Sequence, residues 1–559
     1  MKIANPSQLL SAFIRSTTPR EVREILEACG DRPDMGLDEP FGSLGLFWHA
    51  FDDNTSNFST IGLGTKPGRS LTERLTNAMD AILDERVVAG VDPPRSSREA
   101  AQKWFGRPVT GPDEGMFQWD FAGGGYDRRI AVVLASSGME SRPTVDVLDD
   151  GIGLTPDEFP GTIVSLHEGN KIKKFHLIGA FGQGGASTIA FSEYVIIVSR
   201  QKDRRNIAGF TIIRVLNLSE DYKEDTFAYL ALRNADGKLI APFVDVGNGP
   251  LILYQSQAGI RLPDLSKGTL VRHVSYVLSN IDGKLGPSPG NLYHFLHTSL
   301  FDPLFPFRLI DLRDPKKSRD ELVSGSRNRL MKLVKKAGPA DDDSGGSEIR
   351  HYRPMEYVVP LGSASPAIGI EYWVVLNYRK SKGAKGEELI LRPQSNELYV
   401  DTGHPVLGTL NGQNQGELTG LILRDLGLGM IAKHIVIHID ATNSDRRVRR
   451  ELFATSREGF KDGPVLEDLK RVLTNMVKED EALYALEREL TERLVKRESE
   501  TTSEEVRRQV TRLLLDAGFR VKEEGPSVKP GEKEGEKQPV SQPQSGMPHK
   551  LAPRRSQLH

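Results

Sequence analysis

Apolar and polar positions repeat with two different periods along the chain, and these periods predict where helices and strands lie. Apolar residues at helical spacing predict one strong helix at about 71–87. Runs of aliphatic and β-branched residues predict strands at Ile130–Ala135, Thr144–Leu148, Tyr194–Ser199, Ala208–Val215 and Thr269–Val274. Strands that follow a few helices favour an α+β sandwich, with helices on one face of a mostly antiparallel sheet.

The same patterns divide the chain into five segments. They are a helical lead-in (1–55), an α+β domain (56–275), a mixed second domain (276–462), a helical segment (463–524) and a tail (525–559). Ile370–Leu376 and Ile435–Ile439 are the clearest strands of the second domain. The stretch 88–128 is interpreted as an inserted surface loop. The tail is rich in Pro, Gly, Lys and Glu, so we expect it to be disordered.

Composition narrows the class of protein. A length of 559 residues indicates two or three domains, and a formal net charge of −2 does not require a polyanionic partner. One cysteine, Cys29, excludes an intrachain disulfide or a paired-cysteine metal site. These features predict a cytoplasmic protein without a membrane span.

The predicted first helix carries candidate chemistry on one face. Glu73, Asn77 and Asp80 follow i, i+4, i+7 spacing, while Leu75, Ala78, Met79 and Ile82 fall on the opposite face. The polar side is either a solvated face or a nucleotide site. In a nucleotide site, the Asn77 oxygen is a hard ligand suited to Mg²⁺, and Glu73 is placed to activate a water molecule.

Glycine-rich motifs follow this helix. A predicted strand ends in Asp149-Asp-Gly151-Ile-Gly153, where the alternatives are a plain turn and a backbone that approaches a flat ligand closely. The segment Gly179–Gly185 is either a tight connection or a phosphate-binding loop. It does not match the P-loop pattern. A Gly268-Thr269 pair begins a later predicted strand.

In this order the motifs resemble those of the GHKL ATPases, the superfamily of DNA gyrase B subunits, ninety-kilodalton heat-shock chaperones, histidine kinases and MutL proteins. The local likeness of TERLTNAMDAIL and IGAFGQGGAST to the chaperone ATPase domain is closest, and the resemblance covers about residues 60–275. It implies a Bergerat-type ATPase domain that binds ATP and Mg²⁺, followed by a transducer-like middle domain.

The resemblance also implies roles for individual residues. Glu73 would be the general base, Asn77 would ligate Mg²⁺ and Asp149 would bind the adenine amino group. The other nucleotide-binding residues would be Asp80, Gly151, Gly153, Gly179, Gly182, Gln183, Gly184, Gly185 and Thr269. A softer likeness at 452–459 makes Arg457 the candidate contact of the γ-phosphate, with Lys461 in reserve.

The expected function is ATP hydrolysis that drives a conformational clamp, with an ATP-dependent homodimer. Its client would be a protein or DNA, and a role in bacterial defence is suggested only by analogy. One alternative is a regulatory module that binds nucleotide without turnover. A histidine kinase is disfavoured, because no long helical segment with a phospho-acceptor histidine precedes the predicted ATPase region.

Overall fold

The computed structural model of the chain describes residues 3–62, 66–106, 129–165, 174–178, 186–217, 225–257, 259–278, 281–335, 346–359, 367–383, 386–454 and 459–496. The chain divides into two compact units, Met1–Thr491 and Glu492–His559, and the fold below is that of the first. Helices and two mixed sheets are both present, which confirms the α+β class. The predicted tail lies outside the described residues.

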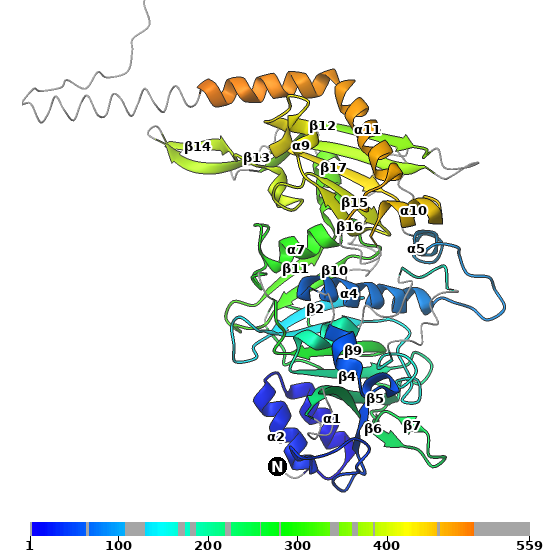
Figure 1. Cartoon of the computed structure of the whole chain (residues 1–559). Helices are drawn as coiled ribbons and strands as arrows, with labels where there is room; N and C mark the ends of the chain where they lie inside the picture. The colour runs from blue at the N-terminus through cyan, green and yellow to red at the C-terminus, as the bar shows by residue number, and fades with distance from the viewer. Residues whose placement is uncertain are drawn as a thin grey trace, which may run out of the picture. The chain divides into compact units, whose positions relative to one another are not determined.

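The first sheet contains all five strands that were predicted for residues 130–274 (Figure 1). Its order is β1 (Phe47–Ala50), β6 (Thr226–Arg233), β5 (Ile207–Leu216), β4 (Tyr194–Arg200), β9 (Gly268–Val274), β3 (Thr144–Asp149), β2 (Ile130–Ala135), β10 (Phe307–Asp311) and β11 (Arg319–Val323). The short strands β7 (Leu239–Ile240) and β8 (Phe243–Asp245) pair with β6 and β5. Every pairing is antiparallel except that of β10 with β2.

Helices cover both faces of this sheet, which corrects the expectation of helices on one face. Helices α1 (Pro6–Arg15) and α2 (Pro19–Cys29) pack on the face that Val133 and Val198 share. The other face, which includes Val132, is covered by α4 (Pro67–Asp84), α5 (Ser97–Phe105) and α7 (Leu292–Ser299). Successive residues of a strand point to opposite faces, so a strand buried throughout, such as β2, requires cover on both sides.

Part of the predicted surface loop at 88–128 is helix α5. The Ser96 side chain accepts a hydrogen bond from the Glu99 N–H (3.1 Å) at the start of the helix, and Gly106 ends it with a φ of 65°. Ala100, Ala101 and Phe105 are buried. A nine-residue helix whose buried stripe is mostly alanine has a weak periodic signal. Residues 107–128 lie outside the described residues.

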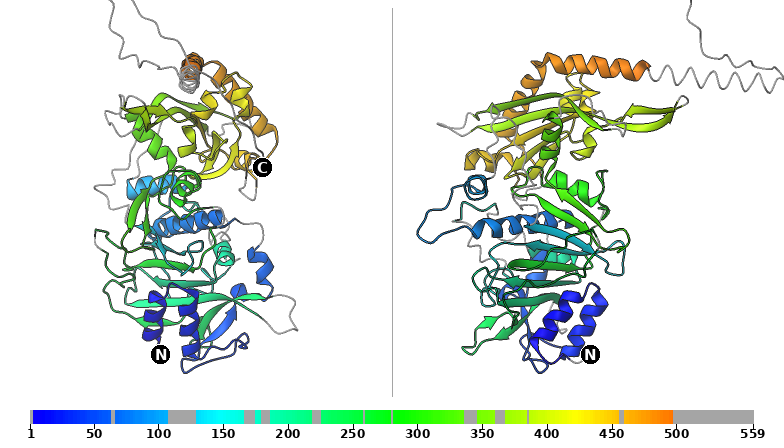
Figure 2. Two further views of the ribbon diagram at one scale, coloured as in Figure 1. Left: turned by 90° about the vertical axis from the view of Figure 1, so that its left-hand side faces the viewer. Right: turned by 180° about the vertical axis from the view of Figure 1, so that it is seen from behind.

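The second sheet has the order β12 (Ser347–Tyr357), β13 (Ile368–Gly383), β17 (Ile435–Asp440), β15 (Val406–Leu410) and β16 (Gln413–Leu418), with β14 (Gly386–Leu391) paired to β13. Strands β15 and β17 are parallel. Around this sheet lie α8 (Ser326–Lys335), α9 (Leu421–Arg424), α10 (Arg446–Leu452) and α11 (Pro464–Lys478), as Figures 1 and 2 show. Residues 481–496 are also helical.

The apolar stripe of the C-terminal helices packs within the chain. Leu469, Leu473, Met476, Leu483, Leu486 and Leu490 are buried in one core with residues of the second sheet. These apolar residues, from Leu469 to Leu490, therefore pack within the chain. We do not assign them to a dimer interface.

The sheets divide the chain at other positions than the predicted domains. Strand β1 lies in the predicted lead-in, and β10 and β11 lie in the predicted second domain, yet all three belong to the first sheet.

No described helix is long and apolar enough to cross a membrane.

A buried ion pair ties the N-terminal helices to the centre of the first sheet. Arg272 on β9 donates to both carboxylate oxygens of Asp146 on β3 (2.9 and 2.7 Å). The same guanidinium donates to the carbonyls of Ile14 (2.5 Å) and Ser16 (2.9 Å) at the end of α1. Tyr254 donates its hydroxyl to Asp146 at 2.6 Å.

Replacing Asp146 should destabilise the fold strongly. Asp146→Ala leaves Arg272, which is 1% exposed, as a buried charge without its carboxylate. We expect a loss of about 3–5 kcal/mol in unfolding free energy, measured by urea denaturation. The matched control is Glu24→Ala, which breaks the exposed pair with Arg20 and should change stability little. Equal effects of the two substitutions would contradict this account.

Candidate functional site

The polar face of α4 is a packed surface rather than a solvated one. Asp80 is 2% exposed and accepts the Ile178 N–H at 2.6 Å. One turn later, Asp84 accepts from Lys174 (2.6 Å) and contacts His176 (3.1 Å). Residues 174–178 therefore run along this face. Glu73 and Asn77 lie on the same face and remain partly exposed.

Both described flanks of the predicted phosphate loop contact α4. The five predicted residues Gly179, Gly182, Gln183, Gly184 and Gly185 lie outside the described residues. On their N-terminal side, Ile178 is bonded to Asp80. On their C-terminal side, η3 (Ala186–Phe191) follows, and Thr188 accepts a hydrogen bond from Arg74 of α4 (3.2 Å). The described residues on either side of the segment thus contact the helix that carries Glu73 and Asn77.

Asp149 ends β3 beside Thr269, its partner residue on β9. The Gly151 N–H donates to the Asp149 carboxylate at 2.9 Å. Burial raises the pKa of the Asp149 carboxyl to about 7, although the Gly151 bond acts in the opposite direction. The residue as a whole is partly exposed, although its carboxyl group is buried.

The glycines near Asp149 are required by the packing of the protein itself. A Cβ on Gly151 would lie 2.7 Å from the backbone of Ala81 in α4. Gly153 has a φ of 66°, and a Cβ there would lie 2.0 Å from the Arg200 carbonyl oxygen. The Ile152 N–H donates to the Ala81 carbonyl at 3.0 Å. The Asp149 motif and the α4 motif therefore meet at Ala81.

Three groups of this site were missed in the sequence. Lys267 pairs with Glu85 (2.8 Å) and Asp150 (3.1 Å), which fixes the end of β3 against the end of α4. Ser199 on β4 is within 2.8 Å of the Thr269 hydroxyl. Burial lowers the pKa of Arg74 to about 10, and this guanidinium lies beneath the polar face. Only Lys267 had a sequence signal, as the residue before Gly268-Thr269.

The second sheet reaches the same helix through the β15–β16 hairpin. The Gln413 side-chain amide donates to the Glu73 carboxylate at 2.9 Å. The turn before Gln413 is held by the Asp302 N–H, which donates to the Gly412 carbonyl (3.0 Å). Gly412 has a φ of 78°, and a Cβ there would lie 1.8 Å from the Asp302 carbonyl oxygen. This close approach fixes the hairpin tip beside α4.

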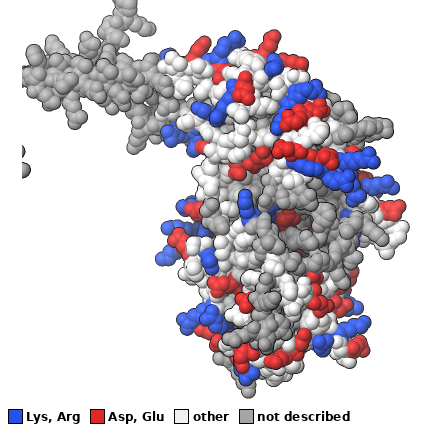
Figure 3. Space-filling model, viewed as in Figure 1, with Lys and Arg blue, Asp and Glu red and all other residues white. Residues whose placement is uncertain are grey.

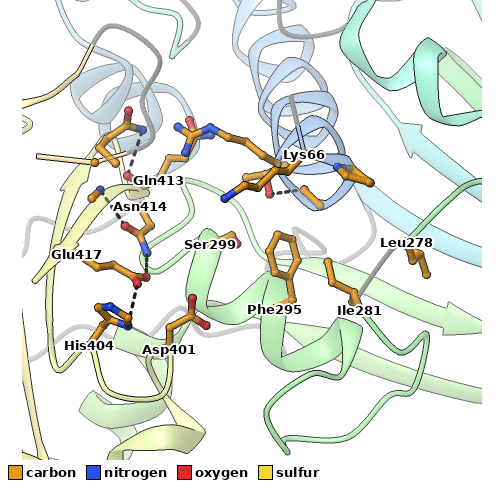
Figure 4. A pocket seen from close by; sticks show the side chains of 17 residues that line it. Lys66, Leu278, Ile281, Phe295, Ser299, Asp401, His404, Gln413, Asn414 and Glu417 are labelled. Atoms are coloured by element: carbon orange, nitrogen blue, oxygen red, sulfur yellow. Dashed lines mark hydrogen bonds and ion pairs between the residues drawn. The ribbon is translucent and has the colours of Figure 1, made fainter. Parts of the chain in front are cut away.

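A cavity of about 680 Å³ lies beside this contact (Figure 4). Thr72 of α4 and Gln413 both line it, and Lys66 lies at the start of the helix. Figure 4 shows Glu417, His404 and Asp401 grouped on the side of the second sheet, with Phe295 and Ile281 on another wall. Burial and the neighbouring Asp401 raise the pKa of Glu417 to about 7. The cavity is not lined by Asp149 and is distinct from the predicted adenine site.

Arg457, the predicted γ-phosphate contact, lies outside the described residues, and its role stays a prediction. Gly459, two residues later, lines the cavity together with Gln413. Lys461, the reserve candidate, has its ammonium 3.5 Å from the Glu451 carboxylate.

The described residues contain no group of three or more His, Cys, Asp or Glu side chains that could hold a metal ion.

No protein-family model matches the chain, and a search of the curated proteins finds no relative. The assignment of a function therefore rests on the motifs of the sequence and on the geometry of the described site residues.

The raised pKa of Asp149 predicts a pH-dependent effect of Asp149→Asn on stability. Folding favours the protonated carboxyl, so the charged form costs stability as pH rises from the unfolded pKa of 3.8 towards about 7. The neutral amide removes this cost. We expect the variant to be more stable by about 1–3 kcal/mol near pH 8.5, and similar to the wild type near pH 4, in urea denaturation.

The control is Asp157→Asn, since Asp157 is exposed and should show no such pH dependence. An Asp149→Asn protein that is destabilised equally at both pH values would contradict the prediction.

Proposed function

We propose that the chain is an Mg²⁺-dependent ATPase of the GHKL type, and that the first sheet with α4 forms a Bergerat-type nucleotide site. The observation that carries this proposal is the contact of α4 with the Asp149 motif and with both described flanks of the glycine segment. Asp80 binds the residue before the glycine segment, Arg74 binds Thr188 after it, and Ala81 contacts the Asp149 motif. Motifs that lie about 100 residues apart in sequence are thereby brought to one helix.

The residues present fit the nucleotide. Asp149 offers a carboxyl at the end of β3, where its acceptor oxygens suit an exocyclic amine. Asn77 offers an amide oxygen on the exposed part of the α4 face, and it would hold Mg²⁺ together with phosphate oxygens. The bound metal would offset the negative charge of the phosphates.

Glu73 would act as the general base for the attacking water. Its carboxylate is partly exposed and is oriented by the Gln413 amide. A base must be held within hydrogen-bond reach of the proton that it removes, so a fixed carboxylate favours turnover. Because Gln413 belongs to the second sheet, this bond connects the proposed general base on α4 to the second sheet.

This link supports the clamp. A nucleotide that alters the position of Glu73 would also alter the β15–β16 hairpin and the sheet behind it. In the proposed cycle, ATP binding moves the second sheet, Arg457 contacts the γ-phosphate and two chains associate. The expectation that the client is a protein or DNA comes from the resemblance to the GHKL ATPases. The residues of this site do not identify the client.

Substitutions on α4 separate binding from turnover. Glu73→Gln keeps an oxygen acceptor for Gln413 but removes the base. We expect it to retain Mg–ATP affinity in calorimetry and to lose turnover by about 10²-fold or more. Asn77→Ala should lose both Mg²⁺-dependent affinity and turnover, whereas Glu27→Gln on the exposed side of α2 should change neither. Wild-type turnover in Glu73→Gln would exclude Glu73 as the base. Nucleotide binding by a wild-type protein without turnover would instead identify a regulatory module.

The role of the hairpin is tested by two glutamines of one strand. Gln413→Ala removes the amide donor to Glu73, and we expect turnover to fall about 10-fold with nucleotide affinity unchanged. Gln415→Ala alters a buried glutamine of the same strand that donates to the Gln413 carbonyl instead (3.4 Å). If both variants lose turnover equally, the effect comes from strand packing and the proposed positioning of Glu73 is wrong.

A further inference from the structure

Helix α10 presents a concentration of arginines that the nucleotide site does not use. Five consecutive positions, 446–450, hold four arginines. Arg446, Arg447 and Arg450 are exposed, and Arg449 is half-buried. Val448 and Leu452 are buried in the core of the second sheet. The helix is therefore anchored by its apolar side and exposes cations on the other.

The four arginines outnumber the two carboxylates that adjoin them in sequence, Asp445 and Glu451. No ion pair in the part of the chain that the structure describes involves any of the four arginines, although Arg449 and Arg446 are close enough to interact. Burial and the charge of Arg446 lower the pKa of Arg449, while the charge of Asp445 acts in the opposite direction. The adjacent carboxylates have other partners: Asp445 accepts the Arg447 N–H at 2.7 Å to cap the helix, and Glu451 pairs with Lys461 at 3.5 Å.

The surroundings extend the cationic surface. Figure 3 shows Lys and Arg side chains gathered on the flank of the molecule where α10 lies. Helix α5 lies beside α10 in Figures 1 and 2, and Arg95 and Lys103 in and next to α5 are exposed. Arg98 of α5 reaches Asp440, at the end of the strand before α10, at 2.7 Å. This partly buried bond ties α5 to the strand that precedes α10, and the exposed residues beside it include the bases Arg95 and Lys103 as well as the acid Glu99.

We propose that the surface formed by Arg446, Arg447 and Arg450 binds the phosphate backbone of double-stranded nucleic acid. Guanidinium groups present several N–H donors in a planar fork that matches phosphate oxygens. A protein with a net charge of −2 that leaves several cations unpaired at one place has a local attraction for a polyanion. The exposed positions of α10 are charged and none is a large apolar residue, so the helix has no group to insert into a lipid bilayer.

The recognition would be independent of base sequence. Arginine contacts to phosphate position a protein on a duplex and carry no direct sequence information. Each such contact also releases a counterion, so affinity should fall steeply as salt increases. This surface is separate from Glu73 and Asp149, and its activity requires no nucleotide.

The test compares two triple variants with the same change in charge. One carries Arg446→Gln, Arg447→Gln and Arg450→Gln, and the control carries Arg15→Gln, Arg20→Gln and Arg23→Gln, which are exposed residues of α1 and α2. Binding of a labelled DNA duplex is measured by fluorescence anisotropy over a range of salt concentrations, without ATP. For the α10 variant we expect affinity to fall by about 10-fold or more, and the salt slope to decrease by about 2–3.

Further arms decide between possible ligands. Binding of an RNA duplex of the same length is compared with binding of the DNA duplex, which shows which of the two nucleic acids supplies the phosphodiester groups. Binding to phosphatidylserine vesicles tests whether the surface binds a membrane instead. A variant with lysine at the three α10 positions keeps the charge and should retain most of the binding. If the glutamine variant fails to fold, the lysine variant still tests whether charge at these positions supports binding. Absence of duplex binding by the wild type, equal losses in both glutamine variants, or binding to vesicles alone would overturn the proposal. ATPase activity is assayed separately, so failure of the proposed ATPase leaves this result intact.

Discussion

The candidate site depends on the buried carboxylate of Asp80. A polar group that is 2% exposed is costly unless its acceptor oxygens are satisfied, and here the Ile178 N–H supplies one hydrogen bond at 2.6 Å. That bond holds the chain against α4 immediately before the glycine segment. Asp84, with Lys174 and His176, repeats the arrangement one turn later. The polar face of the helix thus determines where the glycine segment begins.

A second constraint connects the two sheets. Arg98 contacts Asp440 at 2.7 Å and Asp302 at 3.4 Å, and Arg327 contacts Glu371 at 2.5 Å. His438 completes the network by bonding to Glu371 at 2.8 Å. Loss of one partner would leave a buried charge uncompensated, so such a network favours one relative arrangement over loosely packed alternatives. The hairpin that carries Gln413 lies within this arrangement, and Glu73 is accordingly oriented by residues far along the chain.

Charge is distributed unevenly over the same framework. The interior contains arginines whose partners are carboxylates or carbonyls, such as Arg272 and Arg327. Among the described residues, no ion pair involves the arginines of α10, although the charge of Asp445 acts on Arg449. Because a buried guanidinium must be satisfied while an exposed one is satisfied by water, packing explains the first group and leaves the second available for a ligand.

The sequence by itself determined five strands of the first sheet and the two-sided character of α4, because strand alternation and helical spacing are local properties. It also identified Glu73, Asn77 and Asp149 as candidates through their motifs, while their roles stay predictions. Only the tertiary structure placed helices on both faces of the sheet and made α5 part of the fold. The contacts of Gln413 with Glu73 and of Arg98 with Asp440 span 340 and 342 residues. No local pattern encodes such pairs, because they form only when separate elements pack together.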